Sequence, residues 1–146
     1  MAVTVKEITL WRREVVSQPG VLAHTLEPLV GAGADLQVLM AYRYPGDRSR
    51  GAIEVFPVTT RKAAAAAEAA GLGPAGIPVL LVQGDNRAGL GAAVARALAD
   101  AGINIDFLVA QVVGRRYSAV YGFEADADRK KAVSLIKRAR PAGKKR

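Results

Sequence analysis

The sequence predicts an α+β protein that contains two copies of one small module in tandem. The chain matches itself at a shift of 69 positions, so that Gly20 falls on Gly89 and Gly33 on Gly102 without a gap. Between these glycines apolar residues recur as on one face of a helix, and after them apolar residues alternate as in a strand. Each copy is therefore expected to run strand, turn, helix, strand, hairpin, strand, helix.

The helix of each copy follows from its apolar stripe and its ends. In the second copy Leu90, Val94 and Leu98 recur at helical spacing, and the first copy has matching apolar residues. A glycine after each helix supplies the left-handed residue that ends it. Pro28 lies inside the first helix, where an interior proline costs about 3 kcal/mol, so we expect a kink or an early end there.

The hairpins and closing helices complete the two copies. Residues 44–51 predict a long, mobile first hairpin, whereas Gly114-Arg115 predicts a tight second one. The expected remaining elements are strands at 52–58 and 117–124 and helices at 60–70 and 127–140. These assignments place one module at residues 1–73, a second at 74–140 and a basic, flexible tail at 141–146.

Composition restricts the chemistry that is available. The 146 residues include no cysteine and one histidine, His24, which excludes disulfides, thiol nucleophiles and cysteine-ligated metals. No serine motif accompanies His24, so we expect no catalytic triad. We also expect no cofactor. No apolar stretch approaches the roughly 20 residues of a membrane span, and the first ten residues lack a signal-peptide pattern. We therefore expect a cytoplasmic protein that is not an enzyme.

The net charge of +8 is confined to the C-terminal end. Residues 128–146 hold nine of the 21 basic residues and one of the 13 acidic residues, so residues 1–127 are neutral. This distribution is typical of a solvated helix end with a frayed tail. Contact of the tail with an anionic partner is the alternative interpretation.

Two segments carry a resemblance to a known family. The run Asp85-Asn86-Arg87-Ala88-Gly89-Leu90, followed by a helix and by Gly102-Ile103-Asn104-Ile105-Asp106, resembles the ACT domain family. The first copy is similar, from Gln18-Pro19-Gly20-Val21-Leu22 to Gly33-Ala34-Asp35-Leu36. The resemblance covers nearly the whole chain twice and stops at the basic tail.

The resemblance implies tandem ferredoxin-like (βαββαβ) modules with antiparallel sheets and helices on one face. It also implies a regulatory protein that binds a small molecule, typically an amino acid, at an interface between modules or in a homodimer. The glycine turn lets a carboxylate approach backbone N–H groups at a helix N-terminus. The candidate ligand-binding residues are Asn86, Arg87, Gly89, Leu90, Asn104 and Ile105 in the second copy, and Ser17, Gln18, Gly20, Val21, Asp35 and Leu36 in the first.

The second copy is the better candidate site. It offers both Arg87 and Asn104, whereas Asp35 in the first copy would repel a carboxylate. Structural roles in the turn and crossover are the alternative for each of these residues. Each module also needs a fourth strand, and only residues 77–84 are available between the copies. The copies would share this strand, or both would lack one and expose edges that dimerisation could cover.

Three other functions remain open. Tyr117, Tyr121 and Phe123 alternate beside Arg115-Arg116, as in a sheet that binds RNA, although alternating aromatics are also typical of a strand's core face. A protein interaction or assembly module is possible on the same fold. Val82-Gln83-Gly84 followed by Arg87 is similar to the phosphate loop of acylphosphatase, but the arginine is displaced by one position and the catalytic asparagine context is missing.

Overall fold

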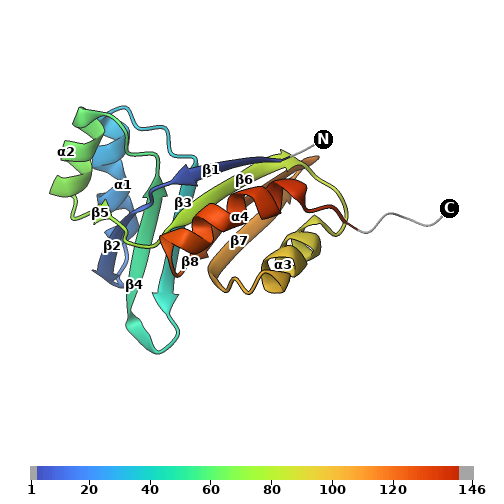
Figure 1. Cartoon of the computed structure of the whole chain (residues 1–146). Helices are drawn as coiled ribbons and strands as arrows, with labels where there is room; N and C mark the ends of the chain where they lie inside the picture. Colours follow the sequence, from blue (N-terminus) through green and yellow to red (C-terminus); the bar gives the residue numbers. More distant parts are fainter. Residues whose placement is uncertain (1–2, 142–146) are drawn as a thin grey trace. The chain divides into compact units, whose positions relative to one another are not determined.

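A computed structural model describes residues 3–141, and the chain divides into two compact units. We call Thr9–Gly76 the first module, and residues 3–8 together with 77–141 the second module. The described residues form two antiparallel four-stranded sheets and four helices (Figure 1). The expected α+β fold, with antiparallel ferredoxin-like sheets and helices on one face, is thus confirmed. Within this part of the chain, no helix is long and apolar enough to cross a membrane.

The first module has the complete βαββαβ order. Its elements are β2 (Trp11–Val16), α1 (Val21–Gly31), β3 (Val38–Tyr44), β4 (Asp47–Phe56), α2 (Arg61–Ala69) and β5 (Gly73–Pro74). The strands lie in the order β3-β4-β2-β5, and each neighbouring pair is antiparallel. The fourth strand is short, because β5 pairs with β2 only through Gly73 and Pro74.

The second module obtains its fourth strand from the start of the chain. Its elements are β6 (Val79–Asp85), α3 (Leu90–Asp100), β7 (Ile105–Val113), β8 (Arg116–Phe123), α4 (Asp126–Arg138) and β1 (Thr4–Ile8). The strand order is β1-β6-β8-β7, so β1 takes the place that β5 takes in the first module. The expected shortage of strands is resolved without sharing, since each sheet has four of its own.

The contacts divide the chain at other positions than the expected 1–73 and 74–140. Strand β1 pairs along β6, from Thr4 with Gln83 to Ile8 with Val79, and therefore belongs with the second sheet. Arg129 of α4 supports this placement, because its guanidinium lies 3.6 Å from the Glu7 carboxylate of β1. Of the expected tail at 141–146, residues 142–146 lie outside the described residues.

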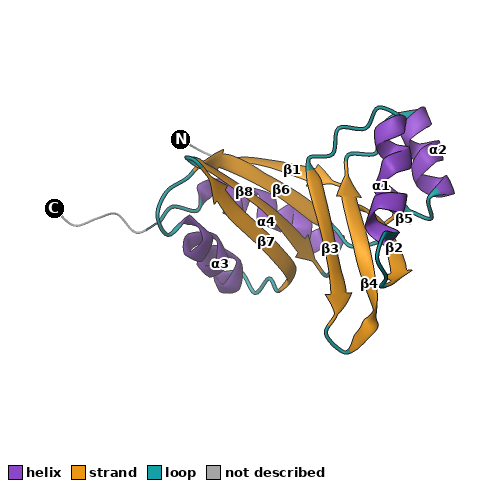
Figure 2. Ribbon diagram, turned by 180° about the vertical axis from the view of Figure 1, so that it is seen from behind, coloured by secondary structure: helices purple, strands orange, loops and turns teal. Residues whose placement is uncertain are grey.

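In each module both helices lie on one face of the sheet (Figure 2), and the buried core lies on that face. In the first module Leu29 of α1 and Ala67 of α2 pack on the sheet with Val15, Ile53 and Val55. The second core is larger. It contains Leu80, Val82, Leu90, Val94, Leu98, Ile103, Tyr117, Ala119, Tyr121, Phe123, Ala132 and Ile136. The thin alanine layer of α2 explains the difference in size, because alanine buries little apolar area.

Two local expectations need correction. The first hairpin is not a long mobile loop, since Tyr44 pairs with Asp47 and the turn consists of Pro45 and Gly46. Its extra length forms a bulge within β4, because the pairing jumps from Arg43 with Gly51 to Tyr44 with Asp47. Helix α1 also continues past Pro28 to Gly31, so the early end does not occur.

Candidate functional site

Each module places a glycine turn between its first strand and its first helix. Gly20 precedes α1 with φ +89°, and Gly89 precedes α3 with φ +86°, a left-handed conformation that side chains disfavour. Neither helix has a side-chain cap at this glycine. The first residue after β2 and the first residue after β6 make equivalent hydrogen bonds. The Ser17 N–H donates to Ser49 O at 2.7 Å, and the Asn86 N–H donates to Arg115 O at 2.8 Å.

The backbone of β3 lies close to Gly51, next to the bulge in β4. The Asp47 carboxylate holds the bulge by accepting bonds from the Ser49 N–H at 3.1 Å and the Ser49 hydroxyl at 2.6 Å. A Cβ on Gly51 would lie 2.2 Å from Tyr42 O, which no side chain can tolerate without moving the strand. Glycine is therefore required at this position, and the helix-facing side of the sheet stays uncovered there.

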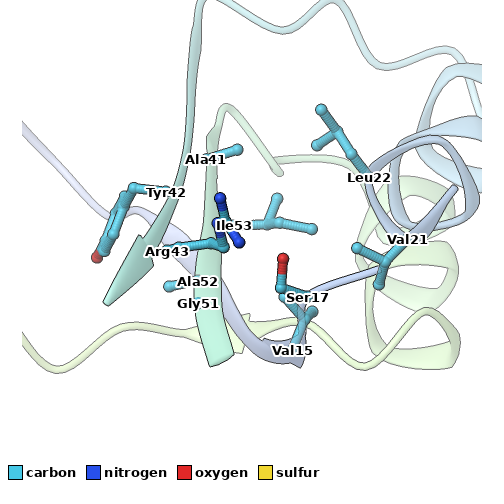
Figure 3. Close-up of a pocket in the computed structure, with 10 residues that line it drawn as sticks. All are labelled: Val15, Ser17, Val21, Leu22, Ala41, Tyr42, Arg43, Gly51, Ala52 and Ile53. Carbon is cyan, nitrogen blue, oxygen red and sulfur yellow. The ribbon is translucent and has the colours of Figure 1, made fainter. Parts of the chain in front are cut away.

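A pocket of about 330 Å³ lies above Gly51, between the start of α1 and the hairpin end of the sheet. Ten residues line it: Val15, Ser17, Val21, Leu22, Ala41, Tyr42, Arg43, Gly51, Ala52 and Ile53. Figure 3 shows Arg43 reaching from β3 towards Ile53 and Ser17, whereas the Tyr42 ring points away from them. The pocket thus combines apolar walls with one guanidinium and one hydroxyl.

The second module fills the corresponding space with a tyrosine. Gly51 pairs with Val15, and Tyr117 pairs with Gly84, which is the repeat partner of Val15. Tyr117 is buried in the core, and its hydroxyl lies 2.7 Å from the Tyr121 hydroxyl. Ala119 between them on the same face leaves room for the two rings. A tyrosine side chain therefore occupies the volume that is open in the first module.

The opposite face of the first sheet carries a polar network. Tyr44 Oη donates to Glu14 Oε2 at 2.6 Å and accepts from Arg12 at 2.6 Å, while Arg50 pairs with Glu14 at 2.8 Å. The Tyr44 hydrogen bond, with help from Arg50, lowers the pKa of Glu14. The adjacent Tyr42 hydroxyl donates to Glu54, and burial together with this bond raises the pKa of Tyr42 to about 12. This network orders β2, β3 and β4 below the pocket.

The candidate residues of the first copy separate into two groups. Ser17 and Val21 line the pocket, and Gln18 and Gly20 form the turn beside it. Asp35 and Leu36 lie at the other end of the module, before β3. Strands β2 and β3 both begin at the same end of the sheet, because Trp11 pairs with Val55 of β4 and Val38 pairs with the next residue, Phe56. The turn before α1 lies at the opposite end, where Val16 of β2 pairs with Arg50. The structure therefore does not bring Asp35 or Leu36 to the turn within a module.

The candidates of the second copy separate in the same way. Arg87 and Leu90 line a cavity of about 10 Å³ that is too small for a metabolite, and Asn86 stands exposed in the turn. Gly89 borders an open groove of about 530 Å³ along α3. Its two arginines are engaged, because Arg96 pairs with Asp100 and Arg140 donates to carbonyls of its own helix end. Asn104 and Ile105 lie at the opposite end, before β7. The favoured role of this copy in binding stays a prediction.

Sequence reasoning missed the sheet side of the pocket, chiefly Ala41, Arg43, Gly51 and Ile53. A gapless repeat hides them, because the bulge shifts β4 against β8 and conceals the match of Gly51 to Tyr117. The available signal was a glycine followed by a continuous apolar run, where the other copy has a tyrosine.

The aromatic residues of β8 do not form an exposed platform. Tyr117, Tyr121 and Phe123 are all buried, so the core interpretation is confirmed and the RNA-platform interpretation is wrong for these residues. On α4, Arg129 and Lys130 pair with Glu7 and Asp126. Among residues 3–141, no group of three His, Cys, Asp or Glu side chains is arranged to hold a metal ion.

Comparison with known proteins finds solved structures of similar fold. Neither family models nor curated protein sequences match the chain. Protein BT0572 from Bacteroides thetaiotaomicron is similar in structure, with a TM-score of 0.74 and 15% identity over 89% of this chain and 88% of that chain. The ligand-free regulatory subunit of aspartate kinase from Thermus thermophilus has a TM-score of 0.62 and 19% identity, over 95% and 97%.

A third structure extends the same likeness. The regulatory subunit of aspartate kinase from Thermus flavus has a TM-score of 0.54 and 20% identity, over 93% of this chain and 97% of that chain. At such low identity the likeness shows that the chain shares the fold of these structures, and it does not establish a function.

Proposed function

We propose that this protein is a regulatory module that binds a small molecule, of the amino-acid class, without catalysing a reaction. The observation that carries the proposal is the pocket beside the glycine turn of the first module. Its volume of about 330 Å³ falls at the lower end of the range typical of small-molecule sites.

The chemistry of the pocket supports an amphipathic anion as ligand. Val15, Val21 and Ile53 offer an apolar wall, and Arg43 offers a guanidinium that can pair with a carboxylate in bidentate fashion. Helix α1 begins at the pocket without a capping side chain, and its dipole favours a negative group at that end. The fold that the chain shares with aspartate kinase regulatory subunits supports a regulatory role.

Strand β7 supports the further proposal that two copies associate. It is an edge strand of the second sheet, and Leu108, Val109, Val112 and Val113 are between 42% and 64% exposed. A long, apolar edge is a template for pairing with another strand. Because residues 107–113 carry no charge, two antiparallel β7 strands would meet without repulsion. A Val109→Lys variant is therefore expected to elute as a monomer in size-exclusion chromatography, and an unchanged dimer would contradict this pairing.

A thermal-shift screen against the twenty amino acids tests the binding proposal. A ligand that binds only the folded state at one hundred times its Kd adds about 2.7 kcal/mol of stability. We expect a selective rise in Tm with one amino acid or a small chemical group of them. If none of the twenty raises Tm at millimolar concentration, the proposed function is refuted.

Acyl-phosphate hydrolysis tests the absence of catalysis. Arg87 is exposed at the turn of the second module, where a phosphate loop of the acylphosphatase type would place an arginine. We expect no turnover. Hydrolysis that disappears in an Arg87→Ala variant would show that the protein is an enzyme.

A further inference from the structure

We infer that each chain binds one short aliphatic carboxylate, held by Arg43 in the first module, and that Tyr117 closes the equivalent place in the second module. This inference rests on the proposed function and names its ligand class and its stoichiometry. It follows from the difference between two copies that otherwise share their turn, their helix and their sheet.

The lining of the pocket selects the ligand class. Six of its ten lining residues are aliphatic: Val15, Val21, Leu22, Ala41, Ala52 and Ile53. Arg43 supplies the single cationic group, and none of the ten described lining residues is acidic. A carboxylate therefore finds a partner, and a short apolar side chain finds a surface to cover. A second positive group on the ligand side chain would face Arg43 without a counter-charge.

The difference at Gly51 sets the stoichiometry. Gly51 cannot carry a side chain without displacement of the β3 backbone, because Tyr42 O lies 2.2 Å from the position of its Cβ. Its counterpart Tyr117 is 4% exposed and hydrogen-bonded to Tyr121, so its ring stays in the core. Arg43 of β3 pairs with Gly51, and its repeat partner Val112 of β7 pairs with Tyr117 in the same way. The second module therefore has an uncharged valine where the first has the guanidinium. At the place equivalent to the pocket, the second module thus lacks both the space and the cation.

Titration calorimetry on the full chain tests the inference with four probes. L-valine and 3-methyl-2-oxobutanoate share the short aliphatic carboxylate, and only valine has an ammonium group. L-valinamide lacks the carboxylate, and L-lysine adds a cationic side chain. We expect one molecule bound per chain for at least one of the two aliphatic carboxylates, and binding at least tenfold weaker for the amide and for lysine.

Two variants and their matched controls locate the site. Arg43→Gln should weaken binding roughly ten- to hundredfold, the usual range for a lost charge-assisted hydrogen bond. Ala41→Phe should abolish binding by filling the pocket. Arg61→Gln removes an exposed arginine of the same module, and Ala110→Phe alters the repeat partner of Ala41, so both should bind as the unchanged protein does.

The possible failures are distinguishable. Two molecules bound per chain, equal binding of the amide, or loss of binding in Ala110→Phe but not in Ala41→Phe would each overturn the inference. If an amino acid outside the aliphatic class raises Tm while neither aliphatic carboxylate binds, the inference fails and the proposed function stands. If no amino acid raises Tm and no probe binds, both fail.

Discussion

The paired hydroxyls of Tyr117 and Tyr121 allow a sharp test of how the second module closes its core. The two oxygens lie 2.7 Å apart in the buried core. Tyr121→Phe removes one of them and leaves the Tyr117 hydroxyl buried without its partner, which costs about 1–3 kcal/mol. Tyr117→Phe should cost a similar amount for the same reason. The double variant leaves no unpaired hydroxyl, so it should lose less stability than the two single variants together.

Denaturant unfolding of the four proteins measures this double-mutant cycle. The change should appear in the midpoint and not in the slope, because the surface exposed on unfolding is nearly unchanged. We expect a coupling energy of about 1 kcal/mol or more between the two hydroxyls. Additive losses, with a coupling energy below about 0.3 kcal/mol, would refute the hydrogen bond and with it the fixed position of the Tyr117 ring.

Three further predictions follow from the backbone and from the tyrosines. Gly51→Ala should destabilise the first module by about 1–3 kcal/mol, because the new Cβ would meet the β3 backbone. Gly46→Ala is the control: no atom lies within 4 Å of its Cβ, so the same denaturant assay should show a far smaller change in stability. Gly89→Ala should destabilise the second module, because Gly89 has a φ of +86° that side chains disfavour. Gly91→Ala, inside α3, should stabilise the same module by about 0.5–1 kcal/mol. Denaturant unfolding curves that shift in the same direction for both variants would contradict this. Burial raises the pKa of Tyr121, and burial together with the hydrogen bond to Glu54 raises the pKa of Tyr42 to about 12. An ultraviolet titration of the folded protein should therefore show both tyrosines ionising above pH 10. The stability that these two protons contribute is complete below the unfolded pKa of about 10 and is lost as the pH rises through the folded pKa values.

At acidic pH, stability is expected to change with pH in the opposite direction, and Glu14 contributes to that change. Because its bonds to Tyr44 and Arg50 lower the pKa of Glu14, the stabilisation is present above the unfolded pKa and is lost as the pH falls towards the folded one. A Glu14→Gln variant should therefore lose part of the pH dependence of unfolding below pH 5. An identical pH dependence in both proteins would contradict this role.

Local patterns were sufficient to predict most elements of the fold. The match of Gly20 to Gly89 and of Gly33 to Gly102 predicted both first helices, since each glycine has the left-handed φ that the pattern requires. The place of β1 was not predictable from such patterns. Its residues Thr4–Ile8 precede the first module in sequence but pair with β6 of the second, and that choice depends on non-local pairing.

The candidate site was only partly predictable for a related reason. Ser17 and Val21 lie in the turn that the repeat identifies, and they do line the pocket. Arg43 and Gly51 pair with each other across β3 and β4 and also line the pocket, but the bulge beside them shifts β4 against the gapless repeat and hides their match to Val112 and Tyr117. The resemblance grouped Asp35 and Asn104 with the turn. However, the strands before and after each first helix run parallel, β2 with β3 and β6 with β7, so these two residues lie at the other end of each module.

The most direct test of the central claim is an amide chemical-shift titration of the full chain, by nuclear magnetic resonance, with the aliphatic carboxylate that binds. Selective changes at Ser17, Val21, Arg43 and Gly51, with unchanged signals at their partners Asn86, Leu90, Val112 and Tyr117, are the predicted result. Changes centred on the second module, or equal changes in both, would contradict the claim that the first module alone holds the ligand.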